Sequence, residues 1–588
     1  MDTRQIIQQK IQEYLKTLGI DQEVILEVPK DKEHGDLTSN IVLKSAKLLG
    51  KNPIELANAI IELFKDSTEL SNVEIAGPGF LNFYINKTLT KSLISQILDN
   101  PNFGETKTIN QKWLIEHTSP NPNKAMHLGH LRNNVTGMAI ANIAKAAGAD
   151  VVTDCIDNNR GIAIAKLMWG YLKFANKDSN KLTEDINYWS NNKSEWMTPE
   201  DANLTPDKFM DKMYVKASED FKNSEVEQKV RQLVVDWEAE DNLTWDLWHT
   251  VLNYVYAGQK KTLERLSSHW DYVWHEHEHY KEGKDIVEQG LKKGIFVKLA
   301  DGAIVTNLKE YKIPDTIVIK KDGTSLYITQ DLALTKKKID KFNPDKIFWV
   351  IGPEQSLAMS QVFAISNQLG FGPLEKFNHI AYGFISIKGQ GKMSSRAGNV
   401  IYIDDLLDDA RDSVIEKIKN DNLTEEQKQE VAEKVGVAAV KYSILKVGRT
   451  TDTAFDFETS LSFEGDSGPY LMYTYARCAS MLRQFGKTIA VPQNLEAIYN
   501  TPEESDLLRL LASFTDVIKE AAINYSPNLV CGYLFELSQC FNKFYNQHSV
   551  LKAENNELIE SRVALTAATS SVIKKGLALL GIDTVEAM

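Results

Sequence analysis

The stretch of the chain best equipped for chemistry is 119–130, which reads Ser-Pro-Asn-Pro-Asn-Lys-Ala-Met-His-Leu-Gly-His. A short apolar run, 113–115, precedes it, and an amphipathic run over 131–147, closed by Gly148, follows it. This pattern predicts a strand, a turn rich in proline and asparagine, and a helix. Because a helix N-terminus carries unpaired N–H groups and a partial positive charge, the corner is suited to binding phosphate.

Two imidazoles and a glycine could supply the contacts to such a phosphate. His127 and His130 are three residues apart, so both side chains can point to the same side of the corner. Gly129 lets a ligand approach the backbone closely. The alternative is that a His-x-Gly-His tetrapeptide arises by chance, and the tetrapeptide alone does not exclude it.

A second segment, 391–399, reads Gly-Lys-Met-Ser-Ser-Arg-Ala-Gly-Asn and follows the strand-like run 382–387. Glycines near both ends favour a mobile loop, and Lys392 and Arg396 supply charge for a phosphate that becomes more anionic as it leaves. The alternative for this segment, taken alone, is that it is a basic surface loop without function.

Found together in this order, the two segments resemble the HIGH and KMSK signatures of the class I aminoacyl-tRNA synthetases. Further stretches resemble the arginyl-tRNA synthetase family in particular and extend the resemblance over nearly the whole chain: Glu-Val-Pro-Lys at 27–30 through Gly-Pro-Gly-Phe at 77–80, Glu-His-Thr-Ser-Pro-Asn at 116–121, Tyr-Ile-Thr-Gln-Asp at 327–331, and Gly-Pro-Tyr-Leu-Met-Tyr-Thr-Tyr-Ala-Arg at 468–477. The resemblance implies an arginine–tRNA ligase. Such an enzyme activates L-arginine with ATP to arginyl-adenylate and transfers it to the 3′ end of tRNA(Arg), releasing pyrophosphate and AMP.

The resemblance also implies which residues bind arginine. A guanidinium is planar, permanently charged and carries five donors, so its pocket needs acidic and hydroxyl acceptors in a fixed plane. The matching positions hold the required residue types: Glu116, Tyr327 and Asp331 around the guanidinium, Asn121 and Gln355 at the α-amino end, and His127 beside them. An alternative for Asp331 is a helix N-cap, because a helical pattern follows it, and the two roles are compatible.

The ATP site implied by the resemblance combines the two signature segments. Its residues are Lys124, His127, Gly129, His130, Lys392, Met393, Ser394 and Ser395. Ser395 departs from the common signature, which has a second lysine there, and Lys124 or Arg396 is expected to make the missing phosphate contact. Mg²⁺ is expected to accompany ATP, held mainly by the phosphates rather than by a protein cage.

Two groups of residues match positions of the family that contact tRNA. Phe80 and Asn82 match positions near the D-loop, and the positions near the anticodon loop are matched by Tyr470, Arg477, Tyr545 and Met588. Stacking and charge are general means of reading unpaired RNA. The alternative for Phe80 is that it packs in the hydrophobic core instead of contacting tRNA. Arginyl enzymes commonly need bound tRNA before they form the adenylate, and the same dependence is expected here.

Composition restricts the partners and the compartment. The 588 residues include 67 basic and 80 acidic side chains, a net charge of −13, so any RNA must meet local basic patches. The four cysteines, Cys155, Cys478, Cys531 and Cys540, show neither disulfide nor zinc spacing. No apolar run reaches the ~18 residues of a membrane span, and no signal-peptide core is found at the N-terminus. A cytoplasmic monomer without a membrane partner is expected.

The fold class expected around these residues is multidomain α/β. It combines a Rossmann-like class I catalytic core that carries an insertion with an N-terminal α+β domain and a C-terminal all-α helical bundle. The expected boundaries are 1–108 for the N-terminal domain, 109–405 for the catalytic domain with its insertion at about 160–300, 406–460 for a helical stem and 461–588 for the anticodon-binding domain.

Other readings stay open. The segment 275–279 reads His-Glu-His-Glu-His, and alternation along a strand would place its three histidines on one face, as in a zinc site. No supporting cysteine accompanies it, and the family carries no metal there, so no protein metal site is expected. A catalytically silent tRNA-binding paralogue is disfavoured by the intact motifs. A small-molecule nucleotidyltransferase would leave the terminal RNA-binding domains without a purpose.

Overall fold

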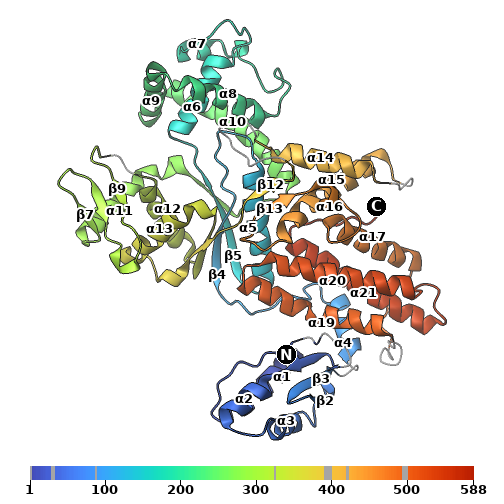
Figure 1. Ribbon diagram of the computed structural model, residues 1–588. Helices are drawn as coiled ribbons and strands as arrows, with labels where there is room; N and C mark the ends of the chain where they lie inside the picture. Colours follow the sequence, from blue (N-terminus) through green and yellow to red (C-terminus); the bar gives the residue numbers. More distant parts are fainter. Residues whose placement is uncertain are drawn as a thin grey trace. The chain divides into compact units, whose positions relative to one another are not determined.

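The computed structural model describes residues 3–27, 29, 34–85, 89–323, 326–389, 400–418, 423–492 and 501–588 (Figure 1). The chain divides into two compact units, each made of three separate stretches. The first comprises Met1–Phe103, Arg477–Phe514 and Glu536–Ile573, and the second comprises Gly104–Ala476, Thr515–Phe535 and Lys574–Met588. Both signature segments therefore belong to the second unit.

The N-terminal part of the first unit is an α+β domain, as expected. Its helices are α1 (Thr3–Thr17), α2 (Ile41–Leu49) and α3 (Pro53–Glu62), followed later by α4 (Leu89–Asp99). Its antiparallel sheet has the order β1 (Leu37–Ser39), β3 (Phe80–Ile85), β2 (Leu70–Ala76). Ile7, Ile11 and Leu15 repeat at helical spacing on α1 and are fully buried in the common core, which stabilises the helix there.

A five-stranded parallel sheet forms the centre of the second unit. Its order is β11 (Phe377–Ile380), β10 (Lys346–Val350), β4 (Lys112–Glu116), β5 (Asp150–Asp157), β6 (Tyr272–His275). Chain order therefore runs outward from β4 in one direction and then resumes on its other side at β10, which is the doubly wound arrangement. Ligands of such sheets bind outside the carboxyl ends of the strands, where the winding reverses. The expected Rossmann-like core is confirmed, and its binding edge contains the end of β4.

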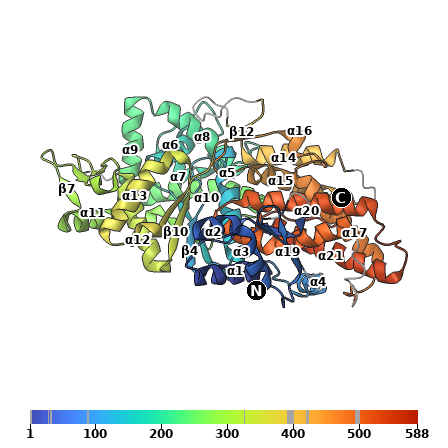
Figure 2. The same ribbon diagram turned by 60° about the horizontal axis from the view of Figure 1, so that its bottom comes forward.

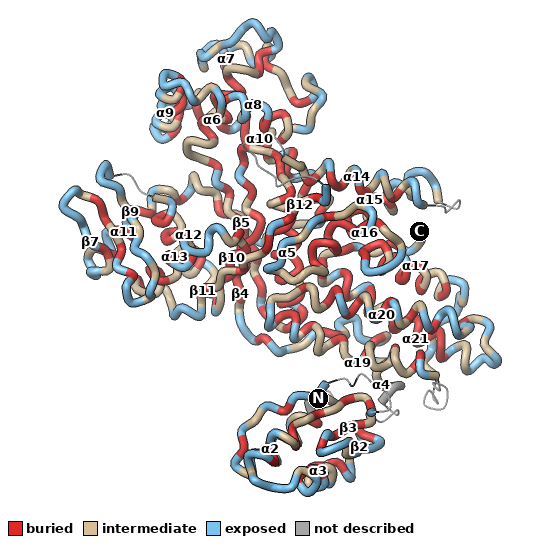
Figure 3. Tube along the Cα trace, viewed as in Figure 1, coloured by how far each residue is buried: buried red, intermediate tan, exposed pale blue. Residues whose placement is uncertain are grey.

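Helices cover both faces of this sheet (Figures 1 and 2). α12 (Tyr327–Phe342) and α13 (Ser356–Leu369) cover the face that carries Leu114 and Ile347, while α5 (Leu128–Ala146) lies against the other face. After its first residue, each of β4 and β10 is buried along its length (Figure 3). Burial on both faces is typical of a parallel sheet, and it accounts for the continuous apolar run at 113–115.

The insertion between β5 and β6 is a helical subdomain with its own core. Its helices are α6 (Ile162–Phe174), α7 (Ile186–Asn191), α8 (Pro206–Asp220), α9 (Ser224–Glu238) and α10 (Asn242–Arg265). The core buries five of the tryptophans that make this stretch unusual in composition: Trp169, Trp189, Trp196, Trp237 and Trp248. The chain returns to the parallel sheet at β6, earlier than residue 300, the expected end of the insertion.

Between β6 and α12 lies α11 (Gly283–Lys292), followed by a small antiparallel sheet of β7 (Phe296–Lys298), β8 (Ile304–Thr306) and β9 (Ile317–Ile319). β12 (Ile385–Ile387) pairs in parallel with β13 (Thr453–Phe455). The other elements of the C-terminal part are helices, as expected: α14 (Ile403–Ile415), α15 (Glu425–Leu445), α16 (Phe457–Ser460), α17 (Gly468–Phe485), α19 (Pro502–Ile523), α20 (Pro527–Gln547) and α21 (Asn556–Leu579). Within the described part of the chain, no helix is both long and apolar enough to cross a membrane.

A buried lysine fastens the last stretch of the second unit to its catalytic part. Lys441 on α15 is 4% exposed, and its ammonium donates to the carbonyl of Leu266 at 2.7 Å and to that of Gly581. The hydroxyl of Tyr475 donates to Glu586 at 2.7 Å. The residues after α21 are therefore joined through Lys441 to the loop that leads into β6.

α5 packs unusually closely against the residue that follows β4. A Cβ atom added to Gly137 would lie 2.4 Å from the Cβ of His117. His117 is itself buried and cannot move into solvent without opening the sheet. Only a residue without a side chain fits at this crossing, so Gly137 sets the distance between α5 and the end of β4.

We expect Gly137→Ala to lower the free energy of unfolding by ~1–3 kcal/mol, because overpacking must displace His117 or shift α5. The matched control is Gly532→Ala on α20, where an added Cβ meets open space. That change should stabilise the protein by up to ~1 kcal/mol through helix propensity. Denaturant unfolding followed by tryptophan fluorescence measures both, and a Gly137→Ala variant as stable as the wild type would contradict the packing argument.

Candidate active site

The chain turns sharply directly after β4, at the binding edge of the sheet. Thr118 and Ser119 have φ values of 72° and 39°, in a left-handed region that costs a non-glycine residue ~1–3 kcal/mol. Asn133 on α5 accepts the N–H of Thr118 at 2.7 Å and donates its own amide to the carbonyl of Val350 at 2.8 Å. The hydroxyl of Ser119 accepts the N–H of Ile156 at 3.0 Å. Contacts to β5, β10 and α5 thus hold the strained turn in place.

His127 and His130 cap the start of α5 reciprocally. Nδ1 of His127 accepts the N–H of Gly129 at 3.2 Å, and the N–H of His127 donates to Nδ1 of His130 at 3.2 Å. The two rings stack with their centroids 3.9 Å apart. The helix therefore begins at Leu128, earlier than the amphipathic pattern indicates, and the histidines expected at the ATP site lie at its first turn.

Burial determines the charge of both rings, and the same hydrogen bonds determine which nitrogen carries the proton. Burial is the main cause that lowers the pKa of His127 to about 4 and that of His130 well below its usual value. Both rings are therefore neutral at pH 7. Because Nδ1 of each ring is an acceptor, the single proton of each neutral ring lies on Nε2. The corner thus offers two neutral Nε2–H donors beside the N–H groups of the first helical turn, which suits an anion.

The second signature segment, 391–399, lies outside the described residues, which resume at residue 400. Lys392, Met393, Ser394, Ser395 and Arg396 lie outside them, and so does Lys30. The chain that follows is hydrogen-bonded across the start of α5: the N–H of Leu128 donates to Ile401 at 3.0 Å, and the N–H of Ile403 donates to Met126 at 3.0 Å. Residues 401–403, which follow the second segment, therefore lie at the corner that carries the two histidines.

Lys124 and Asn121 lie in the turn before the histidines. Lys124 is partly buried, and burial lowers its pKa, while the neighbouring charge of Asp211 raises it. Asp211 is held by the hydroxyl of Tyr402, which donates to it at 2.7 Å. Asn121 is exposed, and its side-chain oxygen accepts the amide of Asn158 at 3.2 Å. Lys124 is thus placed in the corner where it is expected to meet a phosphate.

A buried cation that the sequence did not reveal pairs with Glu116. Lys338 on α12 is 2.5 Å from Glu116 and 2.7 Å from Asp154 on β5, and the indole N–H of Trp274 also donates to Asp154 at 2.8 Å. Lys338 is one of three consecutive lysines, so composition gave no reason to single it out. The only signal was its spacing of seven residues from Asp331, which places both on one side of a helix.

Asp331 is not a helix N-cap. α12 begins at Tyr327 with Leu326 in the capping position, because Tyr327 and the polar residues after it already form the first turn. Asp331 lies inside the helix, and neither a hydrogen bond nor an ion pair to its carboxylate is seen among the described residues. Burial, with Glu116 nearby, raises the pKa of Asp331 to about 7.

Two further residues expected around arginine are open to solvent. Tyr327 is 85% exposed, and Gln355 is exposed at the end of the short 3₁₀ turn Pro353–Gln355. Glu116 is the last residue of β4, and its charge acts on Asp331. The structure therefore brings the two acids of the expected site together and leaves Tyr327 and Gln355 open to solvent.

The run His275–His279 does not continue as a strand, so the expected alternation is wrong. β6 ends at His275, and Glu276–Glu278 form a 3₁₀ turn. The ring of His275 is 2.7 Å from Asp157, a hydrogen bond that raises its pKa, and His279 is buried. In the part of the chain that the structure describes, no group of three histidine, cysteine or acidic side chains is arranged to hold a metal ion.

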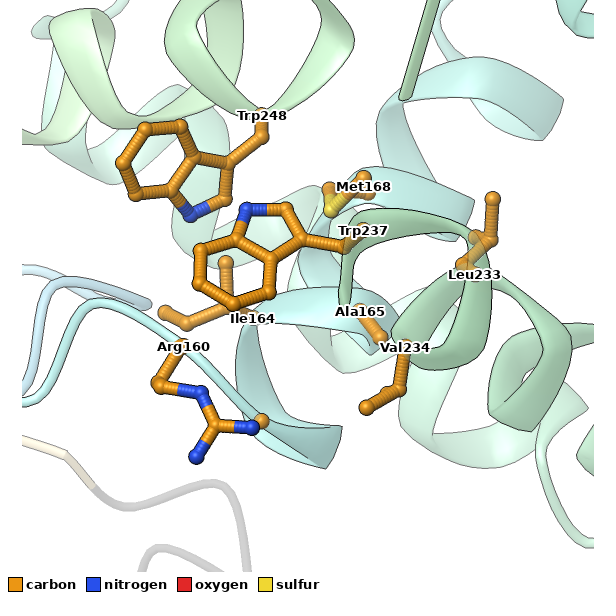
Figure 4. Close-up of a pocket in the computed structure, with 9 residues that line it drawn as sticks. Arg160, Ile164, Ala165, Met168, Leu233, Val234, Trp237 and Trp248 are labelled. Atoms are coloured by element: carbon orange, nitrogen blue, oxygen red, sulfur yellow. The ribbon is translucent and has the colours of Figure 1, made fainter. Parts of the chain in front are cut away.

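A small crevice lies where the insertion meets the end of β5. The indole of Trp237 lies between Arg160 and Trp248 (Figure 4), with the guanidinium 5.4 Å from its ring centroid. Arg160 also pairs with Glu238 on α9 and lies 3.7 Å from Glu276. The crevice has a volume of about 10 Å³, the size of one water molecule. It is too small for a substrate, and its side chains join the insertion to the sheet.

The residues expected to contact tRNA differ in accessibility. Phe80 is 38% exposed, so its alternative as a core residue is wrong. Asn82 is 3% exposed and accepts the hydroxyl of Thr38 at 2.9 Å, which joins β3 to β1. Arg477 lies 4.8 Å from the ring centroid of Tyr545, which is 38% exposed.

Tyr470 and Met588 belong to the second unit. The centroid of the Tyr470 ring is 5.8 Å from that of Phe535, and the two rings are inclined at 64°. Met588, the last residue of the sequence, is partly buried. A contact of these residues with RNA stays a prediction.

Comparison with known proteins bears on the identity of this fold. The family model described as tRNA synthetases class I (R), catalytic domain, matches residues 93–168 and 193–457. An arginyl tRNA synthetase N-terminal domain matches 3–85, and a DALR anticodon binding domain matches 471–588. The arginine–tRNA ligase of Bacteroides thetaiotaomicron is 33% identical over 586 residues, covering 95% of each chain. That of Treponema denticola is 32% identical, covering 97% of this chain and 95% of its own.

Solved structures agree in fold. The Thermus thermophilus arginyl-tRNA synthetase matches all of both chains with a TM-score of 0.79 at 23% identity. The Plasmodium falciparum enzyme matches 99% of both with a TM-score of 0.76 at 18% identity. The doubly wound sheet with its histidine corner is thus a class I aminoacyl-tRNA synthetase core, of a class whose reaction uses ATP. Within that class, the chain belongs to the arginyl-tRNA synthetase family, the arginine–tRNA ligases.

Replacing His127 separates its capping role from its role as an Nε2–H donor. Asparagine is also a good N-cap, so His127→Asn should cost less than ~0.5 kcal/mol of stability, whereas His127→Ala should cost ~1 kcal/mol. Neither side chain reaches the position of Nε2, so we expect both to lower the rate of pyrophosphate exchange into ATP by ~10²–10³. Exchange assays and denaturant unfolding measure the two effects, and full exchange in His127→Asn would contradict the donor role.

Proposed function

We propose that this chain binds L-arginine between the end of β4 and α12, activates it with ATP at the corner before α5, and transfers it to tRNA(Arg). The observation that carries the assignment of the arginine pocket is the carboxylate of Asp331. Among the described residues it has neither a hydrogen bond nor an ion pair, and burial with Glu116 nearby raises its pKa to about 7, so its surroundings leave its charge unstabilised. A ligand cation supplies that stabilisation, and a guanidinium is the cation whose several donors match two carboxylates.

The other contacts to arginine follow the family's pattern. Glu116 and Asp331 receive the guanidinium, and Tyr327 covers it after turning inward from its exposed position. Asn121 and Gln355 hold the α-amino group, with His127 nearby. A pocket of this kind rejects apolar amino acids, because they would leave the carboxylate of Asp331 without a cation.

ATP fits the corner as an anion on a helix N-terminus. The Nε2–H groups of His127 and His130 and the ammonium of Lys124 would hold the phosphates, with Gly129 allowing close approach. Lys392 and the serines beside it would meet the leaving pyrophosphate, with Lys124 or Arg396 replacing the lysine missing at Ser395. Mg²⁺, bound mainly to the phosphates, would neutralise charge that develops on them.

The reaction needs positioning more than covalent chemistry. The carboxylate oxygen of arginine attacks the α-phosphorus of ATP in line, the bond to the bridging oxygen breaks, and pyrophosphate leaves with its electron pair. A hydroxyl of the terminal adenosine of tRNA then attacks the arginyl carbonyl, and AMP leaves. Both steps are accelerated by holding the reactants in line and by donors aimed at the developing charge.

The partners complete the proposal. tRNA(Arg) would meet Phe80 through its D-loop, with the buried Asn82 holding β3 to β1. It would meet the remaining predicted contacts through its anticodon loop: Tyr470, Arg477, Tyr545 and Met588. Phe80 and Tyr545 have the exposed rings that stacking on unpaired bases requires. A monomer acting in the cytoplasm is part of this proposal.

Asp331 makes arginine binding dependent on pH. Above pH 7 its carboxylate is ionised before arginine arrives, whereas below pH 7 a proton must leave on binding. Affinity should therefore be full above pH 7 and fall by up to tenfold per pH unit below it. Calorimetry in buffers of different ionisation enthalpy should detect release of about one proton per arginine at pH 6 and almost none at pH 8.5.

Asp331→Asn keeps the volume and removes the charge, so we expect kcat/KM for arginine to fall by ~10², or ~3 kcal/mol, and the pH dependence of binding to disappear. Asp340→Asn is the matched control, since Asp340 is exposed on the same helix and pairs only with Lys336 among the described residues. Unchanged arginine kinetics in Asp331→Asn would refute the pocket assignment.

Amino-acid activation should depend on tRNA, because Tyr327 and Gln355 are exposed and must be turned inward to complete the pocket. Exchange of labelled pyrophosphate into ATP should be nearly absent with arginine alone and should appear when tRNA(Arg) is added. Full exchange without tRNA would contradict this coupling but not the synthetase activity. A silent tRNA-binding protein would show no exchange in either case, and a small-molecule nucleotidyltransferase would be indifferent to tRNA.

A further inference from the structure

A row of side chains from neighbouring strands lies beneath α12. Trp349 on β10 is in register with Glu116 on β4, which is in register with Asp154 on β5. Such residues on parallel strands point to the same face, ~4.8 Å apart. Lys338 lies over the row with no exposed surface, and its Nζ is 2.5 Å from Glu116 Oε2, 2.7 Å from Asp154 Oδ2 and 5.7 Å from the centroid of Trp349.

Lys338 balances charge that burial would otherwise not tolerate. Asp154 is fully buried and Glu116 is 6% exposed. Two carboxylates this close in a dry environment do not both ionise unless a cation lies between them. Burial raises the pKa of Glu116, and the ammonium of Lys338 opposes that rise. The ammonium is thus positioned to keep both acids charged.

The same helix carries the acid expected to receive arginine. Asp331 precedes Lys338 by seven residues, or about two helical turns, so both face the sheet edge. Glu116 interacts with both of them. The charged groups around Lys338 are therefore Glu116 from β4, Asp154 from β5 and Asp331 from α12, while Glu276 after β6 acts on Asp331.

We propose, on the basis of the arginine pocket proposed above, that Lys338 is a positioning and specificity residue for arginine. Its ammonium orients Glu116 toward the guanidinium and keeps Glu116 and Asp154 ionised together. Glu116, Asp154 and Lys338 then carry one net negative charge, and Asp331 adds a second. Without Lys338 the two acids share a proton, and a protonated Glu116 presents a donor where the guanidinium needs an acceptor. The rival explanation is a purely structural link between α12 and the sheet.

The test measures arginine affinity by calorimetry with the full chain from pH 6 to 9. We expect Lys338→Met to weaken binding at least ~10-fold at pH 7 and to move the pH midpoint of binding upward by at least ~1 unit, because the proton shared by the acids is lost only at higher pH. KM for arginine should rise more than kcat falls. Lys338→Arg should retain most of the affinity. Lys336→Met, exposed on the same helix, should behave as the wild type.

A double variant separates charge balance from structure. Asp154→Asn combined with Lys338→Met removes one negative charge together with the positive one, so Glu116 no longer has a like charge beside it. We expect this variant to regain arginine affinity to within ~5-fold of the wild type at pH 7, with the pH midpoint back near 7. A structural link would not be restored by this second substitution.

Wild-type affinity and an unshifted pH midpoint in Lys338→Met would overturn the proposal, and so would a double variant that stays as weak as the single one. If Lys338→Met does not fold, the double variant decides alone by the same criterion, since it removes the buried pair as a unit. Asp331→Asn is measured alongside. Wild-type binding there would refute the arginine pocket itself, whereas its loss beside an unaffected Lys338→Met would refute only the role of Lys338.

Discussion

Asn133 joins three parts of the fold with two hydrogen bonds. From within α5 it accepts the N–H of Thr118 at the end of β4 and donates to Val350 at the end of β10. The two strands on either side of the reversal in winding are thereby fixed to the helix that begins at the same corner. Thr118 and the residue after it hold backbone angles that would relax without this support. The direction in which the chain enters the histidine cap therefore depends on one buried amide.

The acidic edge, where Glu116, Asp154 and Lys338 meet, differs electrostatically from the corner that carries His127 and His130. At the corner, burial keeps the imidazoles neutral, so the phosphate would meet donors and helix ends. At the acidic edge, the ammonium of Lys338 is buried against the carboxylates of Glu116 and Asp154. Burying such a group generally stabilises a fold no better than a packed apolar core, so stability alone does not explain it, and the role proposed above for Lys338 would do so. The two substrates would thus be recognised by different physical means.

Periodicity and motifs predicted the strand, turn and helix around 113–147, the doubly wound core and the helical C-terminal part. These are local patterns, and each segment formed the helix or strand that its own sequence favours. The sequence could not show that His127 caps α5 or that β6 ends at His275, since both depend on hydrogen bonds and pairings made in the folded chain. Lys338 stayed hidden for the same reason. A lysine in a charged run usually faces water. Its burial is explained by acids on two adjacent strands, β4 and β5, that are distant from it in sequence.

Lys441 acquires its partners in the order in which the chain is synthesised. The carbonyl of Leu266 is present long before it, but that of Gly581 follows 140 residues later. At ~5–20 residues per second, a ribosome needs roughly 7–28 s to cover that distance. Throughout this interval the ammonium lacks one of its two acceptors, and the loop leading into β6 lacks its final packing. The nascent catalytic unit is therefore finished only when α21 has emerged, which ties the completion of the chemical site to the synthesis of the helices that follow it.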